Sequence, residues 1–311
     1  MRSNSSLWVV VLAGGDGRRL APATRDASGD HVPKQFCRFG AAETLLNHAL
    51  GRARRLAPPE RLISVVQEAH RRWWRVELAD LPERNVISQP GNRGTAVALL
   101  QAVATIHSRD RDATVLVLPS DHEVEDERAW HATLRRVADA ATLGREHVFL
   151  VGVEPQADAG FGWIVPGDRS EHGTRTVLRF SEKPGIEEAA WLARQGALCS
   201  TFVFASSMRT FLDVFRSHPC ERIARYAQSV SDALPGFGIS AATTLDFPYS
   251  DFSHDLLERA PHRTRLVAGD PCGWTDLGTP NRLARWLGRR GSASSAVRSP
   301  LPSLAGAGGG S

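Results

Sequence analysis

The chain has 311 residues, 42% of them hydrophobic and 23% charged, which is typical of a globular protein with a large buried core. No apolar run approaches the ~20 residues that span a bilayer, and no signal-peptide pattern precedes the first apolar segment. We therefore expect a cytoplasmic protein without membrane association. The net charge of +4 comes from scattered basic residues, which argues against nucleic-acid binding. The cysteines lack metal-ligand spacing and are expected to be reduced thiols (Cys37, Cys199, Cys220 and Cys272).

Strand and helix patterns alternate through the first half of the chain. Strands are predicted at residues 8–12, 62–66, 85–89, 114–118 and 147–153. The helices between them are predicted at residues 44–57, 70–79, 96–104 and 127–143. This alternation indicates βαβ units in a doubly wound sheet, in which ligands bind beyond the carboxyl ends of the strands. By that rule the residues that follow these strands share one site.

The second half is less regular. It contains two strand patterns of a hairpin (160–165 and 176–180), strands at 198–205 and 264–268, and helices at 186–195, 207–215, 221–233, 252–259 and 281–287. From residue 288 onward Ser, Ala, Gly and Pro dominate, which predicts a disordered tail over 288–311.

The first strand ends in a glycine-rich basic segment that the rest of the chain is organised around. Its glycines permit backbone angles closed to other residues, and successive free N–H groups in such a loop form an anion-binding concavity. Two arginines would reinforce that charge. The segment therefore predicts a phosphate site, built from Gly14, Gly15, Gly17, Arg18 and Arg19.

Lysine is almost absent. Of 38 basic residues only Lys34 and Lys183 are lysines, and both adjoin a proline in a polar loop. In an arginine-rich chain, lysine is expected mainly where a compact charge on a flexible stem is needed. We interpret both as functional residues, with chance survival as the alternative.

Two common phosphate-binding patterns do not fit the glycine-rich segment. A P-loop requires Gly-Lys-Ser/Thr, which is absent. A dinucleotide fingerprint fits Gly15 and Gly17 but fails at Leu20, where a third glycine is required. What remains is Ala-Gly-Gly-x-Gly-x-Arg-Leu-x-Pro with a Pro-Lys downstream. This pattern resembles the sugar-1-phosphate nucleotidyltransferases, most closely the mannose-1-phosphate guanylyltransferase branch.

Further motifs of that family follow in its order, so the resemblance covers the chain from about residue 8 to residue 287. They are Gln89-Pro90, Asn92-Arg93-Gly94-Thr95-Ala96, Leu118-Pro119-Ser120-Asp121-His122, Gly160-Phe161-Gly162-Trp163, Phe180-Ser181-Glu182-Lys183-Pro184, Phe252-Ser253-His254-Asp255-Leu256-Leu257-Glu258 and Trp274-Thr275-Asp276-Leu277-Gly278. No single motif is decisive, but their order is specific.

The resemblance implies an α/β fold with a Rossmann-like, doubly wound mixed sheet of the nucleotide-diphospho-sugar transferase type and a small substrate-side subdomain. Residues 1–287 would form the catalytic domain, with a nucleotide-binding half over about 1–155 and a sugar-phosphate half over about 156–287. The implied reaction is attack of a sugar 1-phosphate on the α-phosphorus of a nucleoside triphosphate, with release of pyrophosphate. Such a reaction depends on positioning and charge neutralisation.

The resemblance also implies roles for the charged residues. Arg19 would hold the leaving pyrophosphate with help from Arg18, and Lys34 would reach the phosphates between the two substrates. Asp121 and Asp276 resemble the carboxylate pair that holds Mg²⁺, a cation bound through carboxylates and substrate phosphates. The alternatives are a solvated pair for the arginines, a helix N-cap for Asp121 and a turn aspartate for Asp276.

The remaining site residues follow from the same resemblance. The nucleotide would be bound by Leu12, Ala13, Gly14, Gly15, Gly17, Arg18, Gln89, Gly94 and Thr95. The sugar phosphate would be bound by Gly162, Glu182, Lys183, Ser200 and Asp255. For Gly94 a plain helix start is the alternative, for Glu182 and Lys183 an exposed pair, and for Asp255 a solvated helix position.

The chain departs from the family at one sugar-binding position. The family usually carries an Asn near the strand after the Glu-Lys-Pro helix, whereas the best alignment here places Ser200 at that position. A hydroxyl replaces an amide that offers both a donor group and an acceptor. The identity of the sugar is therefore left open by the sequence.

The predicted activity is a magnesium-dependent nucleotidyl transfer from GTP to mannose 1-phosphate, giving GDP-mannose. Thymidylyl or uridylyl transfer to glucose 1-phosphate is the alternative within the family. A nucleotide-sugar-binding regulator without turnover is the alternative of another class, and an NAD-dependent oxidoreductase fits least well because the third glycine is missing. The sequence leaves a homodimer open.

Overall fold

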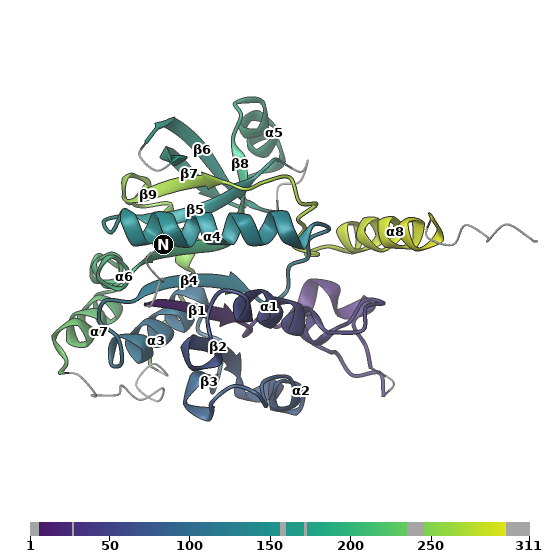
Figure 1. Cartoon of the computed structure of the whole chain (residues 1–311), viewed down its shortest axis with the longest axis horizontal. Coiled ribbons are helices and arrows are strands. Elements are labelled where there is room, and N and C mark those ends of the chain that lie inside the picture. Colours follow the sequence, from purple (N-terminus) through teal and green to yellow (C-terminus); the bar gives the residue numbers. More distant parts are fainter. Residues whose placement is uncertain (1–5, 27, 156–159, 171–172, 235–245, 297–311) are drawn as a thin grey trace, which may run out of the picture.

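The computed structural model describes residues 6–26, 28–155, 160–170, 173–234 and 246–296, which form a layered α/β structure around one mixed sheet (Figure 1). The sheet has nine strands in the order β3-β2-β1-β4-β8-β5-β9-β7-β6. The strands are β1 Leu7–Leu12, β2 Leu62–Gln67, β3 Val86–Gln89, β4 Thr114–Pro119, β5 Val148–Val153, β6 Gly162–Arg169, β7 Arg175–Glu182, β8 Leu198–Ser207 and β9 Thr264–Ala268. The predicted doubly wound mixed sheet is confirmed.

Strand direction decides which loops meet. β1 pairs in parallel with β2 and β4, and β2 pairs in parallel with β3, so these four strands end at one edge of the sheet. β8 comes from the second half of the chain but lies between β4 and β5, antiparallel to both. The two halves therefore share one sheet, and the beginning of β8 lies at the edge where β4 ends.

Helices cover both faces of this sheet (Figure 1). Side chains of α1 (Leu45–Arg54), α2 (Arg71–Glu77) and α4 (Glu127–Leu143) form one apolar cluster with one face of the sheet. Side chains of α3 (Thr95–His107), α6 (Met208–Arg216) and α7 (Glu221–Asp232) form a second cluster with the opposite face.

The two clusters explain the uninterrupted apolar run of β1. Val9 and Val11 belong to the first cluster, and Trp8 and Val10 to the second. Because alternate side chains of a strand point to opposite faces, a strand covered on both faces is apolar throughout. α3 is likewise buried on nearly every side, as its composition predicts.

The substrate-side extension consists of the β6–β7 hairpin and α5 (Ile186–Arg194). The hairpin pairs with β9 and β8, so it continues the main sheet. Figure 1 shows the hairpin and α5 at the top of the molecule, beyond β5 and β9.

The last helix is longer than the sequence predicts. α8 runs from Pro280 to Ala296, nine residues beyond the expected end at Leu287, so residues 288–296 of the predicted disordered tail are helical; residues 297–311 lie outside the described residues. Leu283 and Trp286 anchor α8 in a third apolar cluster, and Arg289 forms an ion pair with Glu125 at 3.2 Å. Once such a helix is nucleated, each further residue adds a hydrogen bond, so a polar sequence can continue it.

No helix in the described ranges is long and apolar enough to cross a membrane.

We predict that Trp286→Ala lowers the free energy of unfolding by about 3–5 kcal/mol, because it removes a buried aromatic side chain from the cluster that docks α8. The neighbouring Leu287 is 41% exposed, so Leu287→Ala is the matched control and should change stability by less than about 0.5 kcal/mol. Urea denaturation measures both. Equal stability of the two variants would show that α8 is not docked through Trp286.

Candidate active site

A cavity of about 480 Å³ opens at the edge where the parallel strands end. The glycine-rich segment after β1, Gln89 at the end of β3 and Asp121 after β4 all line it, as the strand directions require. Ser200 lines it from the beginning of the antiparallel β8. The residues that the sequence predicted for one site are therefore brought together from both halves of the chain.

Most of the predicted residues line this cavity: Leu12, Gly14, Gly15, Gly17, Arg18, Arg19, Lys34, Gln89, Gly94, Thr95, Asp121, Gly162, Glu182, Lys183, Ser200 and Asp276. Two do not. The side chain of Ala13 is fully buried behind the loop, and Asp255 lies behind another part of the wall.

The glycine loop, residues 13–19, is held in place through its carbonyl groups. The buried amide of Gln35 donates to the carbonyls of Ala13 and Gly15, at 2.9 Å each. Gln67 donates to the carbonyl of Gly14, and His31 Nε2 donates to that of Asp16 at 2.8 Å.

The amide groups of the same loop are left available. Across residues 14–19 no N–H has a hydrogen-bond partner within the described part of the chain. A run of unpaired N–H groups beside a cavity is an anion-binding arrangement. The side-chain hydrogen bonds thus use the carbonyl acceptors of the loop and leave its N–H donors for a ligand.

Gly17 is required by both conformation and packing. Its φ is +63°, and a Cβ atom added there would lie 2.7 Å from the backbone nitrogen of Lys34. Arg18 and Arg19 follow in a short 3₁₀ turn, and both are exposed. Arg18 Nε lies 3.7 Å from the Asp16 carboxylate, whereas Arg19 makes no ion pair with any described residue. Arg19 is therefore free to meet an anionic ligand.

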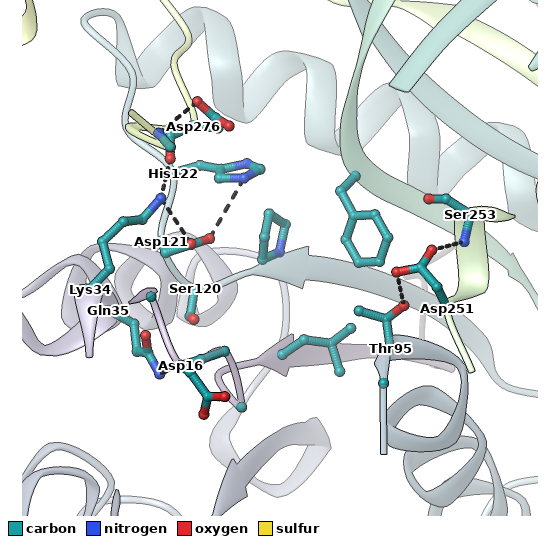
Figure 2. Close-up of a pocket in the computed structure, with 18 of the residues that line it drawn as sticks. Asp16, Lys34, Gln35, Thr95, Ser120, Asp121, His122, Asp251, Ser253 and Asp276 are labelled. Atoms are coloured by element: carbon teal, nitrogen blue, oxygen red, sulfur yellow. Dashed lines mark hydrogen bonds and ion pairs between the residues drawn. The ribbon is translucent and has the colours of Figure 1, made fainter. Parts of the chain in front are cut away.

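Opposite charges gather at one end of the cavity in a carboxylate cluster, defined as Lys34, Asp121, His122 and Asp276 (Figure 2). The ammonium of Lys34 is buried; it lies 2.9 Å from Asp121 Oδ2 and also donates to the backbone carbonyl of Asp276. Burial raises the pKa of Asp121, but the Lys34 ammonium and the other groups around the carboxylate together more than offset this, so the pKa of Asp121 lies below its usual range. Asp121 is thus a carboxylate at neutral pH.

Asp276 is fixed by a basic partner of its own. Its Oδ1 accepts from Arg282 of α8 and from the N–H of Gly278, while Oδ2 has no hydrogen-bond partner among the described residues. Arg282 is itself buried, with its guanidinium carbon 4.2 Å from the centre of the Phe161 ring. Sequence reasoning missed Arg282, which becomes recognisable only when α8 is placed beside the site.

The loops that carry the two carboxylates are joined directly. Glu123 and Thr275 exchange both backbone hydrogen bonds, at 2.9 Å each. This two-residue bridge holds Asp121 and Asp276 at a fixed relative position. His122 belongs to the same cluster. Burial lowers the pKa of His122 to about 4, so its imidazole is neutral at neutral pH. The ring packs edge-on against Trp274.

The cavity offers two carboxylates to a magnesium ion, Asp121 and Asp276. No group of three or more His, Cys, Asp or Glu side chains that could hold a metal occurs among the described residues. Mg²⁺ usually needs only one or two carboxylates, with waters and substrate phosphates completing its shell. Asp121 and Asp276, next to the unpaired amides of the glycine loop, fit a metal that binds together with phosphate.

The opposite wall depends on a contact between Gly94 and Ser250. Gly94 has φ +87°, and a Cβ atom there would lie 2.1 Å from the Ser250 carbonyl oxygen. Ser250 donates its N–H to the Arg93 carbonyl at 3.0 Å and accepts from the Ala96 N–H at 3.1 Å. Gly94 is therefore more than a helix start, because it lets the segment around Ser250 approach α3.

The contact between Gly94 and Ser250 places Asp251 on the cavity wall. The sequence had predicted Asp255 as the acidic residue of this wall. Asp251 accepts from the Thr95 hydroxyl at 3.3 Å and from the Ser253 N–H at 2.9 Å (Figure 2). Asp255 instead accepts from the Ser250 hydroxyl at 2.7 Å and from the Asp251 N–H at 3.1 Å. Asp255 thus supports the wall from behind and does not itself line the cavity. Its contact with the sugar stays a prediction.

The sugar-side residues lie around the β6–β7 hairpin. Lys183 Nζ lies 2.5 Å from Glu182 Oε1, and a Cβ atom at Gly162 would lie 2.8 Å from Glu182 Oε2. The hydroxyl oxygen of Ser200 accepts from the Phe202 N–H at 3.3 Å, which leaves its own proton to donate. Lys183 and Phe202 both have positive φ, at 47° and 54°, and such strain concentrates at ligand sites.

Several wall residues were not predicted: Asp16, Gln35, Asn92, Ser120, His122, Phe161, Phe202, Tyr249, Asp251, Ser253 and Trp274. Six of them stand in the family motifs of the sequence, which was a usable signal: Asn92, Ser120, His122, Phe161, Ser253 and Trp274. Asp251 had no such signal.

We predict that Gly94→Ala lowers the free energy of unfolding by about 2 kcal/mol or more, because a backbone carbonyl blocks the new methyl group. It should also weaken nucleotide binding, because the wall that carries Asp251 must move. Gly91→Ala is the control, since a Cβ atom there meets nothing within 4 Å. Urea denaturation and equilibrium nucleotide titration test both variants. Normal stability of Gly94→Ala would contradict the contact.

The chain is similar to known proteins over nearly its whole described length. Residues 8–287 match the nucleotidyl transferase family. The mannose-1-phosphate guanylyltransferase RfbM of Salmonella typhimurium is 26% identical over 286 residues, covering 89% of this chain and 58% of RfbM. The mannose-1-phosphate guanylyltransferase of Escherichia coli K12 is 27% identical over 294 residues, covering 90% of this chain and 60% of the relative. The chain thus spans less than two thirds of the length of these relatives.

A solved structure has a similar fold. The crystal structure named mannose-1-phosphate geranyltransferase from Thermus thermophilus superposes with a TM-score of 0.75 at 28% identity, covering 88% of this chain and 76% of that chain. The family match runs from β1 into α8, so it includes every residue that lines the cavity. The chain therefore belongs to the nucleotidyl transferase family.

Proposed function

We propose that the protein transfers a nucleotidyl group from a nucleoside triphosphate to a sugar 1-phosphate, with GTP and mannose 1-phosphate as the substrates. One observation carries the proposal: a loop of unpaired amides and the free Arg19 lie in one cavity with Asp276 and with Asp121, which pairs with the buried Lys34. This combination suits a triphosphate whose charge must be neutralised while one phosphorus is attacked.

The reaction needs no covalent protein nucleophile. A phosphate oxygen of the sugar 1-phosphate bonds to the α-phosphorus, the bond from that phosphorus to the oxygen bridging to the β-phosphate breaks, and pyrophosphate leaves with that oxygen. The glycine-loop amides and Arg19 would hold the departing pyrophosphate. Lys34 reaches the same end of the cavity and would stabilise charge between the two substrates, while Glu182 and Lys183 would hold the sugar phosphate.

Asp121 and Asp276 would hold Mg²⁺ together with the phosphates. When bound, the ion would polarise the phosphoryl oxygens and neutralise developing charge. The protein's contribution is to hold both carboxylates in place. Lys34 pairs with Asp121, and Arg282 pairs with Asp276.

The preference for GTP and mannose 1-phosphate rests on the relatives, which are named mannose-1-phosphate guanylyltransferases. The volume of the cavity alone does not distinguish between nucleotides or sugars of similar size. A nucleotide-sugar-binding regulator would use the same cavity without turnover. The substrate panel below separates these possibilities.

We predict pyrophosphate release when the protein is mixed with GTP, mannose 1-phosphate and Mg²⁺, and loss of release on addition of excess EDTA. The panel also contains UTP and dTTP with glucose 1-phosphate. Release only with UTP or dTTP would replace the guanylyl assignment with uridylyl or thymidylyl transfer. No release with any pair would contradict the enzyme proposal and favour the regulator.

We predict that Asp121→Asn and Asp276→Asn each lower kcat by about 100-fold or more, because each removes a charged ligand of the metal. Asp112→Asn, at a highly exposed carboxylate away from the cavity, is the control and should retain full activity. Initial rates of pyrophosphate release at several Mg²⁺ concentrations give the comparison, with thermal melts as a check on folding. Full activity in either cavity variant would contradict the metal assignment for that residue.

A further inference from the structure

Gln89 has a buried partner outside the cavity. Gln89 ends β3 and lines the cavity, and its Nε2 donates to Gln101 Oε1 at 2.6 Å. Gln101 lies on α3 and does not line the cavity. Both side chains are 4% exposed, so water does not compete for this hydrogen bond.

The hydrogen bond fixes which atom of Gln89 faces the glycine loop. A primary amide carries a donor nitrogen and an acceptor oxygen, and Gln101 Oε1 can pair only with the nitrogen. The other atom, Gln89 Oε1, then lies beside Gly14, 3.6 Å from where a Cβ atom of that residue would be. While Gln101 presents Oε1 as it does in the structure, turning the Gln89 amide over would bring two oxygens together in a buried site, which is unfavourable.

We propose that Gln101 is a positioning residue that selects the nucleobase by holding Gln89 with its acceptor oxygen toward the ligand. The inference rests on the proposed function in one respect, that the cavity takes a nucleotide with its base beside Gln89. The inference adds two points to the proposed function. The base carries a ring N–H, and Gln101 helps to select it without touching it.

A fixed acceptor suits a base that presents a ring N–H. Guanine has one at N1, and uracil and thymine have one at N3. Adenine N1 and cytosine N3 are unprotonated acceptors. Each would place a second partially negative atom against Gln89 Oε1, with no proton between them to form a hydrogen bond. Because a buried polar group left without a partner is costly, the site discriminates against adenine and cytosine nucleotides.

The unmodified protein tests the chemistry of the base. Equilibrium titrations compare GTP, ITP, 2-aminopurine riboside triphosphate, UTP, ATP and CTP. ITP keeps the ring N–H of guanine, whereas 2-aminopurine riboside triphosphate keeps the 2-amino group and loses the ring N–H. We expect ITP to bind within a few-fold of GTP and the 2-aminopurine nucleotide to bind at least about tenfold more weakly, which corresponds to about 1.4 kcal/mol. Equal binding of GTP and the 2-aminopurine nucleotide, or preferred binding of ATP or CTP, would overturn the proposal.

The variant Gln101→Met tests the role of Gln101. It keeps the size of the side chain but removes the acceptor, so Gln89 can present either atom. We expect the ratio of GTP to ATP affinity to fall at least about tenfold. Ser64→Ala is the matched control: Ser64 is fully buried on the adjacent strand β2, lies off the cavity wall and has a hydroxyl without a partner among the described residues.

A merely structural role for Gln101 predicts a different result. It would weaken both nucleotides equally and leave the ratio unchanged, which would overturn the positioning role. Circular dichroism and thermal melts check folding; if Gln101→Met does not fold, the analogue series on the unmodified protein still decides. Binding is measured without turnover, so a failure to release pyrophosphate is distinguishable from a failure of base selection. Preference for UTP would refute guanylyl transfer and leave this inference standing.

Discussion

The buried ammonium of Lys34 ties together three segments that are far apart in sequence. It pairs with Asp121 after β4, donates to the carbonyl of Asp276 before α8, and its backbone contacts Gly17 of the glycine loop. Removing the ammonium would leave the Asp121 carboxylate without its partner. The site depends on this charge, because it favours the ionised form of Asp121 and joins the loops that carry Asp121 and Asp276. A compact ammonium on a flexible stem can make these contacts at once, which gives a physical reason for a lysine in a chain that otherwise uses arginine.

The rest of the site follows from strand direction. Four parallel strands end at one edge, and the antiparallel β8 begins at that edge, so one cavity receives loops from both halves of the chain. Several parts of the wall are held by hydrogen bonds from neighbouring side chains: Gln35 and Gln67 hold the glycine loop, Arg282 holds Asp276, Asp255 holds Asp251, and Gln101 holds Gln89. Such support is how a site made of loops is kept in place on a rigid scaffold.

Long-range contacts explain where sequence reasoning was incomplete. Asp255 and Asp251 are both acidic and four residues apart, and nothing local distinguishes the one that faces a ligand. The contact of Ser250 with Gly94, more than 150 residues earlier, decides it by turning Asp251 to the cavity and Asp255 behind it. The end of α8 was missed for a similar reason, since its polar composition indicates disorder and only its docking through Trp286 and Arg289 sustains the helix.

The sequence by itself determined the alternation of strands and helices, the glycine loop and about half of the residues of the cavity wall. Apolar periodicity and glycine angles are local properties, and parallel strands must end at a common edge. The remaining predicted wall residues followed from the ordered motifs that the chain shares with its family. The tertiary structure alone decided three features. They are the insertion of β8 between β4 and β5, which of Asp251 and Asp255 lines the cavity, and the orientation of the Gln89 amide. Each of these depends on a partner distant in the chain, and a pattern in sequence carries no information about which buried donor meets which acceptor.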